Sequence, residues 1–354
     1  MSNPIIIPNR LNWIDWAKVF AITFVVFGHT PQEPGSFPQY YIVTFHMPLF
    51  FFISGYLTKK ELFNKATMKK YWHTLIIPYF CYNIIFYPYW IVRHVIDSPQ
   101  AEWYDFIKPL IGTFMLQCET PYFESLNGVT WFIVSLIGYK IILSICNMHK
   151  YGKHFMSLLA ILAAIAYVLN EFHLYTKDLP PIGFIKCLPF FYLGHLCKHK
   201  GIISDKPNSK DWYLCPGWLC CSLICYLIPD QMSSIPLFAL RFWSVSICGT
   251  MGVLSFCKLL DPIHSKIIDN ISIGTIVIMG LHFMMIGTTN FVLEKAFGIE
   301  GRIIYPWYIA AVLSMFFIAL LYPLIILFKN KYPFMLGKGY TTKTVSDTRC
   351  GIKS

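Results

Sequence analysis

Three side chains that could do chemistry share one face of the first long apolar stretch. Asp15, Lys18 and His29 lie within WIDWAKVFAITFVVFGHT, whose other residues are mostly apolar. Lys18 and His29 are eleven residues apart, almost three helical turns, so a helix would place them on one face roughly 16 Å apart. Asp15 lies three residues before Lys18 and joins that face. Ionisable groups within a membrane helix are costly, which indicates a functional site that faces protein.

A simpler alternative accounts for the same residues. Lys18 would extend its amine to one membrane surface, and His29 would be hydrogen-bonded near the other. The next apolar stretch, YYIVTFHMPLFFFISGYL, adds His46 and follows the first after a short segment rich in Pro and Gly. We therefore expect a helical hairpin that carries the candidate site and is held by the rest of the chain.

The composition is that of a membrane protein. Of 354 residues, 56% are hydrophobic, 18% aromatic and only 13% charged, whereas soluble domains carry about 25% charged residues. The few charged residues are clustered, which leaves repeated apolar runs of membrane-spanning length. Asp15 and Lys18, together with the lack of a small-residue cleavage site, argue against a cleavable signal peptide at the first run.

We expect an all-α, polytopic integral membrane protein with ten transmembrane helices. Ten spans place both termini on the same side, and no solenoid-type repeat is visible. The expected spans are Trp13–Thr30, Gln39–Leu57, Trp72–Ile96, Val129–Asn147, His154–Phe172, Gly183–Lys198, Trp212–Ile228, Pro236–Lys258, Ile271–Leu293 and Ile303–Phe328.

The distribution of basic residues orients these spans. Twenty of the 29 Lys and Arg residues would lie on the side of the termini, and the opposite side would hold Lys108, Lys177, Lys295 and Arg302. This asymmetry predicts cytoplasmic termini in a multi-pass inner (plasma) membrane protein, with residues 329–354 as a basic cytoplasmic tail. The net charge of +11 then reflects orientation, and no nucleic-acid partner is expected.

One apolar segment is ambiguous. Phe106–Leu116 contains Pro109 and Gly112 and is too short to span a membrane. If it did span, the later basic loops would face outward. We therefore expect residues 97–128 to form an external loop with a re-entrant or interfacial helix, suited to a lid or an acceptor site.

Other residues are candidates for the same site. The first cytoplasmic loop, KKELFNKATMKKYWH, is strongly basic and suits either anionic lipid or a phosphate-bearing ligand. His282, in ISIGTIVIMGLHF, is either a packing residue or a second functional histidine, and Arg241 is a further cation at the membrane boundary. The twelve cysteines lack metal-ligand spacing, so we expect neither disulfides nor a metal site.

The hairpin IDWAKVFAITFVVFGH…FHMPLFFFISGYL resembles the start of the membrane-bound acyltransferase family 3, nearest to its branch similar to fucose 4-O-acetylase. LIIPYF, TWFIVSL, LPFFYLG and MGLHF agree in order, so the resemblance covers about residues 11–328. It implies a ten-span domain that moves an acyl group, usually acetyl from cytoplasmic acetyl-CoA, to a hydroxyl of a cell-surface or lipid-linked sugar. No resident cofactor is implied, because acyl-CoA is a co-substrate.

The resemblance also assigns residues. His29 takes the place of the family's essential histidine, and Lys18 takes the place of its arginine, which keeps the charge and loses the bidentate fork. The second-span F-x-S-G element is present at residues 52–55. The family's basic RxxxR motif is not intact, and Lys69 and His73 are its nearest match.

A mechanism follows as a hypothesis. The phosphates of CoA contact a basic set, its pantetheine arm passes Lys18, and His29 acts as general base on an acceptor hydroxyl or forms an acyl-histidine. Asp15 assists at the inner end of the same face. The expected CoA contacts are Lys59, Lys60, Lys69, Lys70 and His73, and the expected acceptor contacts are His46, Ser54, Trp131 and Glu124.

Two other function classes fit part of the pattern. A proton-coupled transporter of a small anionic or sugar-like solute would also place His and Lys within the membrane, but paired interrupted half-helices are not visible. A structural subunit would leave the face with Asp15, Lys18 and His29 without a purpose.

Overall fold

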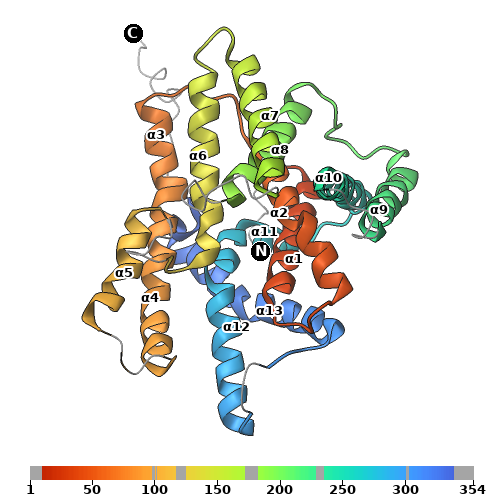
Figure 1. Cartoon of the computed structure of the whole chain (residues 1–354). Coiled ribbons are helices and arrows are strands. Elements are labelled where there is room, and N and C mark those ends of the chain that lie inside the picture. The colour runs from red at the N-terminus through yellow and green to blue at the C-terminus, as the bar shows by residue number, and fades with distance from the viewer. Residues whose placement is uncertain are drawn as a thin grey trace, which may run out of the picture.

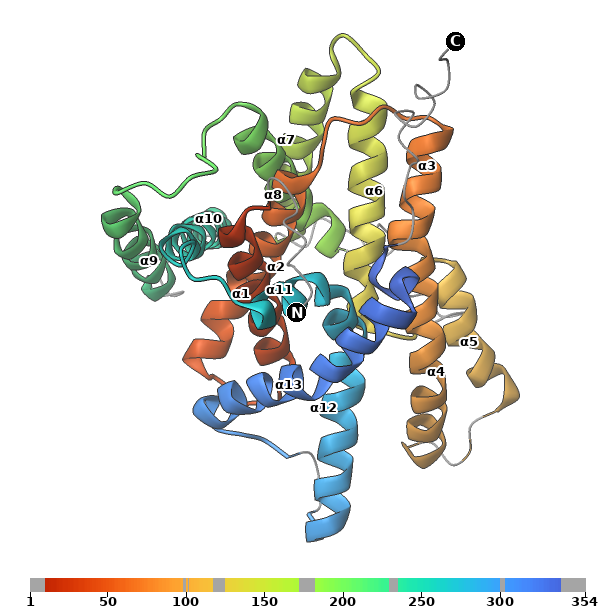
Figure 2. The ribbon, with the colours of Figure 1, turned by 180° about the vertical axis from the view of Figure 1, so that it is seen from behind.

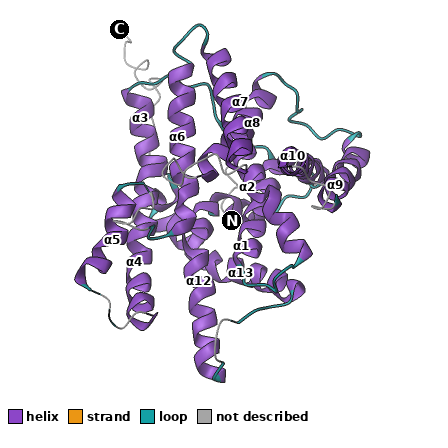
Figure 3. Ribbon diagram, viewed as in Figure 1, coloured by secondary structure: helices purple, strands orange, loops and turns teal. Residues whose placement is uncertain are grey.

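The computed structural model describes residues 10–97, 100, 102–116, 125–171, 182–228, 235–299 and 303–338. These residues are almost entirely helical, and within them the only β-type pairing is an isolated bridge between Gln32 and Tyr305 (Figure 3). The α-helices are α1 (Asn12–His29), α2 (Phe37–Leu57), α3 (Lys65–Tyr71), α4 (Ile77–Asp97), α5 (Trp103–Phe114), α6 (Trp131–Cys146), α7 (Gly152–Glu171), α8 (Ile182–His199), α9 (Asp211–Leu227), α10 (Ile235–Leu259), α11 (Lys266–Ile273), α12 (Thr275–Phe297) and α13 (Trp307–Lys331).

The hairpin of α1 and α2 lies at the centre of the molecule. Helix α2 packs against α8 and α10, while α1 also contacts α10, α11, α12 and α13. Helices α3 to α6 lie on one side of this centre and α9 lies on the other, as both views show (Figures 1 and 2). The predicted organisation around the first hairpin therefore agrees with the packing.

Each of the ten predicted spans overlaps helical structure, although the ninth crosses the break between α11 and α12 and the tenth begins before α13. The all-α membrane fold is confirmed. Seven helices in the described part of the chain are long and apolar enough to cross a membrane. Helices α1, α8 and α9 are not among these seven, so the count of ten and the cytoplasmic termini stay predictions.

The third predicted span begins earlier than expected. Residues Lys65–Tyr71 form α3, which continues through a π-helical segment, Trp72–Ile76, into α4. The Asn64 side chain accepts a hydrogen bond from Thr67 N at 2.9 Å and caps the new start. Part of the basic loop is therefore helical, because a capping residue precedes it.

The ambiguous apolar segment forms α5, a helix of 12 residues beside α4. Tyr79 and Tyr87 of α4 donate hydrogen bonds to the carbonyls of Thr113 and Phe106 at 2.6 and 2.8 Å. A helix of this length is about 18 Å long, which is too short to span, as predicted. Trp103 and Phe114 remain more than 70% exposed at its two ends, an arrangement suited to a membrane surface.

Helices α2 and α8 approach so closely that each requires glycine at the crossing. A Cβ on Gly55 would lie 1.8 Å from the carbonyl oxygen of Phe191, and one on Gly194 would lie 2.0 Å from that of Phe52. Small residues permit this kind of backbone approach in membrane helices. The glycine of the F-x-S-G element therefore has a packing role.

Pro48 opens the hydrogen-bond ladder of α2 in its middle. Because proline has no N–H, the carbonyl of Thr44 loses its helical partner. Ser246 of α10 donates to that carbonyl instead, at 2.9 Å. The opening is thereby repaired by a neighbouring helix, as is typical of membrane proteins.

Contacts from distant segments fix both ends of α1. At its start, Asp261 accepts a hydrogen bond from Trp13 N at 2.8 Å, and the Asp261 carbonyl accepts one from Asn12 at 2.6 Å. Beyond its end, Tyr305 N donates to the Pro31 carbonyl at 3.1 Å, and Glu33 N donates to the Tyr305 carbonyl at 3.3 Å. The face that carries Lys18 and His29 is therefore held at both ends.

Candidate functional site

His29 lines a cavity of about 540 Å³, which we call the histidine chamber. Its wall comes from the end of α1, from α4 and from residues 283–294 of α12. Aromatic rings alternate there with polar groups that suit a hydroxyl-rich ligand. The described residues that line it are His29, Phe86, Tyr89, Arg93, Phe283, Ile286, Gly287, Asn290, Phe291 and Glu294.

The polar groups of the histidine chamber are held in place by their neighbours. Tyr305 donates a hydrogen bond to Asn290 Oδ1 at 2.8 Å, and the Arg93 guanidinium lies 5.3 Å from the centre of the Phe291 ring. A Cβ on Gly287 would lie 1.9 Å from the hydroxyl oxygen of Tyr89. Glycine at this position therefore allows the phenol to lie directly against α12.

His29 lies beside a second histidine. The ring centres of His29 and His282 are 5.2 Å apart, and Phe283 lies 4.6 Å from His29. His282 Nδ1 is 2.9 and 3.0 Å from the carbonyls of Ile278 and Met279. Carbonyl oxygens only accept, so Nδ1 carries the proton and Nε2 presents a lone pair. That buried Nε2 has no hydrogen-bond partner among the described residues.

Lys18 lies between two further cavities. One, of about 330 Å³, is the middle chamber and contains Lys18, Lys70 and Lys140 among its lining residues. The other, of about 490 Å³, is the basic chamber, whose cations are Arg10, Lys18, Lys59, Lys198 and Lys338. Both cavities are also lined by Leu57. Lys18 therefore stands where the two adjoin.

Asp15 is engaged by neighbouring side chains at the rim of the basic chamber. Its Oδ2 lies 2.6 Å from Arg10 Nε, and its Oδ1 accepts a hydrogen bond from Ser272 of α11 at 2.5 Å. Arg10 also pairs with Asp269 at 3.1 Å. Asp15 thus joins α1 to α11 and supplies negative charge near Lys18. This geometry favours a positioning role for Asp15.

Two ion pairs order the lysines at the mouths of these chambers. Lys70 pairs with Glu61, which also accepts a hydrogen bond from Tyr71 at 2.9 Å, and Lys198 pairs with Asp205. Burial alone would raise the pKa of Glu61, but the hydrogen bonds from Lys70 and Tyr71 hold that pKa below its usual value. The basic side chains are therefore positioned by fixed carboxylates.

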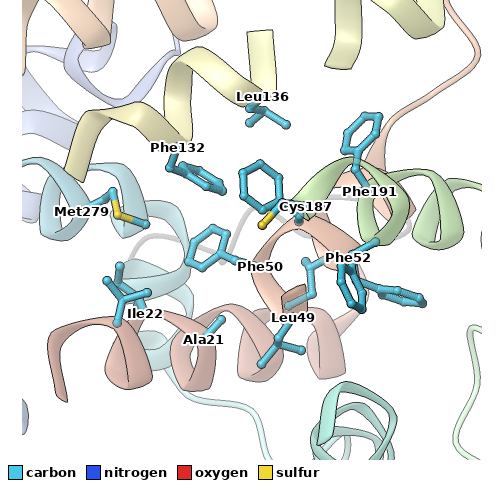
Figure 4. Close-up of a cluster of buried hydrophobic side chains, with 14 of the residues drawn as sticks. Ala21, Ile22, Leu49, Phe50, Phe52, Phe132, Leu136, Cys187, Phe191 and Met279 are labelled. Atoms are coloured by element: carbon cyan, nitrogen blue, oxygen red, sulfur yellow. The ribbon is translucent and has the colours of Figure 1, made fainter. Parts of the chain in front are cut away.

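An apolar barrier separates the middle chamber from His29. On α1, Ile22 and Val25 lie between Lys18 and His29 on the same face, and both are almost fully buried. Phe50 packs edge-on against Phe132 at 4.9 Å, and Figure 4 shows Ile22, Phe50, Phe132 and Met279 gathered together. Buried apolar side chains therefore interrupt the face that carries Lys18 and His29.

The barrier is thin along α12. Met279 lines the middle chamber, Phe283 lines the histidine chamber, and His282 lies between them. Four residues of helix span about 6 Å. Met279 and Phe50 both line the middle chamber, and methionine and phenylalanine are side-chain types that can change rotamer.

With the geometry described, the chain can be compared with known proteins. A family model described as an acyltransferase domain matches residues 11–328. The chain belongs to the membrane-bound acyltransferase family 3. No curated protein and no solved structure matches it. The protein is therefore a multi-pass membrane acyltransferase, and the likeness to the fucose 4-O-acetylase branch stays a prediction.

The expected CoA contacts of this acyltransferase do not form one cluster. Lys59 lines the basic chamber, Lys70 lines the middle chamber, and Lys60 lines a separate pocket beside α7. Lys69 is exposed on α3, and His73 lies in the π-helical segment. Three lysines that were not predicted to contact CoA line these chambers instead, namely Lys140, Lys198 and Lys338.

The expected acceptor contacts are also dispersed. Ser54 lines the middle chamber, and its hydroxyl donates to the Phe50 carbonyl at 2.9 Å. His46 is buried, and its Nδ1 donates a hydrogen bond to the Val43 carbonyl at 2.9 Å, while Trp131 packs against Phe51. Glu124 lies outside the described residues. None of the three described candidates lines the histidine chamber.

The two remaining predicted site residues, His282 and Arg241, lie in different parts of the molecule. His282 lies beside His29, whereas Arg241 lies over the Tyr226 ring at 4.9 Å and donates to the Ile228 carbonyl at 3.2 Å, away from the chambers. Tyr89, Asn290 and Glu294 of the histidine chamber are not among the residues predicted from the sequence. Glu294 follows Asn290 by four residues on α12, and this spacing was the one available signal.

Proposed function

We propose that this acyltransferase moves a short acyl group, with acetyl as the leading candidate, from cytoplasmic acyl-CoA to a hydroxyl of a sugar. The observation that carries the proposal is the placement of Lys18 and His29, about three turns apart on α1, in cavities of different character. One is rich in lysine and suits a polyanion, and the other is aromatic and hydroxyl-binding. The proposed substrates differ in the same way, because acyl-CoA is a polyanion and a sugar is a ring with hydroxyl groups.

The acyl-CoA donor is inferred from the positive charge of the basic and middle chambers. The basic and middle chambers present seven Lys and Arg side chains, and Asp15 is the one acidic residue among their described lining residues. Such a surface favours the phosphates of CoA. The length of an extended pantetheine arm is about the same as the distance along the helix axis from Lys18 to His29. The thioester would therefore reach the imidazole once Phe50 and Met279 turn aside.

The sugar acceptor is inferred from the aromatic rings and the hydrogen-bonding groups of the histidine chamber. Tyr89, Phe283 and Phe291 offer faces for the apolar side of a sugar ring, and Arg93, Asn290 and Glu294 offer donors and acceptors for its hydroxyls. The histidine chamber lies within the size range of small-ligand sites. These residues are better placed than Ser54 or Trp131 to orient a sugar beside His29.

The chemical step assigns a role to each histidine. His282 Nε2 accepts the N–H of His29 after a small ring rotation, which fixes the His29 tautomer and directs its other nitrogen at the acceptor hydroxyl. His29 removes the hydroxyl proton as the oxygen attacks the thioester carbonyl carbon. The C–S bond then breaks, and the thiolate of CoA takes the proton from His29. Transfer through an acyl-histidine remains the alternative order of events.

The direct test is transfer of labelled acetyl from acetyl-CoA to glycan in membranes that contain the protein. His29→Ala should abolish labelling, while His94→Ala should retain it, because His94 stacks on Trp90 and does not line the histidine chamber. Normal labelling by the His29 variant would move the catalytic role elsewhere. Mass spectrometry of surface glycans with and without the protein would then name the acyl group and the acceptor.

A further inference from the structure

A smaller basic pocket lies beside α7. Its volume is about 190 Å³, and its wall comes from the connection after α2 and from α6, α7 and α8. We call it the side pocket. It shares one described lining residue, His199, with the basic chamber and none with the middle chamber.

The side pocket gathers positive charge from three separate segments. Lys60, Lys153 and Lys200 line it, together with His195 and His199, whose ring centres are 4.2 Å apart. None of its described lining residues is acidic. Within the described part of the chain, these three lysines form no ion pair. Like charges gathered without carboxylates favour an anionic ligand.

The rest of the pocket wall is largely apolar. Leu143 and Met156 line it beside the basic groups. Helix α7 begins at Gly152 beside the pocket and then turns an exposed apolar face outward, which includes Leu158 and Leu162. An exposed apolar face on a membrane helix contacts lipid tails. The basic groups therefore lie at the level where lipid headgroups meet the start of α7.

We propose that the side pocket binds the phosphate of an anionic phospholipid whose acyl chains lie along the outer face of α7. Lys153 and Lys200 contact the phosphate, and Lys60 closes over it from the loop after α2. A lipid fits better than the donor CoA, because apolar wall and lipid-facing helix are continuous here. Anionic lipids are concentrated in the cytoplasmic leaflet, where the basic loops are predicted to lie.

The test measures lipid binding directly and does not depend on acyl transfer. Purified protein is titrated with phosphatidylglycerol and with phosphatidylcholine of equal chain length, and bound lipid is counted by native mass spectrometry. The wild type should prefer phosphatidylglycerol. Lys153→Ala with Lys200→Ala should reduce that preference by about fivefold for each lysine removed.

A matched control removes the same charge from the same predicted side of the membrane. Lys206 and Lys210 are exposed in the connection between α8 and α9 and line none of the four chambers and pockets. Lys206→Ala with Lys210→Ala should leave the lipid preference unchanged. An equal loss in both double variants would show diffuse attraction and overturn the proposal.

A second variant separates filling of the pocket from loss of charge. Met156→Trp keeps every lysine and should displace phosphatidylglycerol by occupying the cavity. The thermal unfolding midpoint in lipid-free detergent checks that each variant is folded. If the affinity for acetyl-CoA falls in the lysine variant while lipid preference persists, the phosphate belongs to the donor and the lipid proposal is wrong.

Discussion

The two ends of α1 hold their functional side chains by different physical means. Around Lys18, ion pairs and a hydrogen bond hold the charged side chains, since Arg10 and Ser272 hold Asp15, and Glu61 holds Lys70. Around His29, the neighbours are rings, with Phe283 and His282 in contact. A polyanionic ligand needs fixed cations, whereas a proton-transferring imidazole needs a neighbour that sets its tautomer.

This difference teaches how one helix can serve two substrates. The buried apolar side chains of Ile22, Phe50 and Met279 stand between the Lys18 end and the imidazole (Figure 4). Exclusion of water protects a thioester from hydrolysis until an acceptor is present. Four predictions test the comparison, beginning with the largest effect.

Removal of the imidazole should be most damaging. His29→Ala should lower kcat by about a hundred- to ten-thousandfold, the usual contribution of a general base, and should leave acetyl-CoA affinity near that of the wild type. Steady-state kinetics and isothermal titration with a non-hydrolysable acetyl-CoA analogue separate the two quantities. A variant that also lost donor binding would show that the two ends of α1 are not independent.

Removal of the amine should produce the opposite pattern. Lys18→Ala should raise the KM for acetyl-CoA by about ten- to a hundredfold, as expected for one lost charge-assisted hydrogen bond, with a smaller change in kcat. Lys18→Arg keeps the charge and should recover most of the affinity. The idea would be contradicted by an unchanged KM for acetyl-CoA in the alanine variant.

Gly287→Ala should weaken only the binding of the acceptor. Its new methyl group would collide with the Tyr89 hydroxyl, so we expect the KM for the acceptor to rise by about tenfold, the cost of one displaced contact. Gly217→Ala is the matched control, because a Cβ there meets nothing within 4 Å. Equal behaviour of the two variants would remove Tyr89 from the acceptor site.

The smallest effect concerns acid stability at the Lys18 end. Because the pKa of Glu61 is lowered in the folded protein, its pairing stabilises the protein above about pH 4 and loses that contribution as the pH falls through the folded pKa. Glu61→Gln should remove this pH dependence, with a shift in unfolding temperature of about 2 °C near neutral pH. Thermal unfolding from pH 3 to pH 7 measures it, and parallel curves for the two proteins would contradict it.

Local rules of sequence were sufficient for several features. The composition and the length of the apolar runs determined an all-α membrane protein, because backbone polar groups in lipid must be satisfied within helices. Helical periodicity placed Lys18 and His29 on one face, and the shortness of residues 106–116 excluded a span. Each of these depends on residues near one another in the chain.

Tertiary packing decided how those residues are used. Ile22 of α1 gathers with Phe50 of α2 and Met279 of α12 (Figure 4), and Lys18 and His29 line different chambers. The same packing brings His282 to His29 across more than 250 residues of sequence and sends Lys59, Lys60 and Lys70 to three different cavities. The spacing of residues along a helix determines only the direction in which each side chain points. The side chains that it meets there come from other helices, whose close approach depends on glycines such as Gly55 and Gly287.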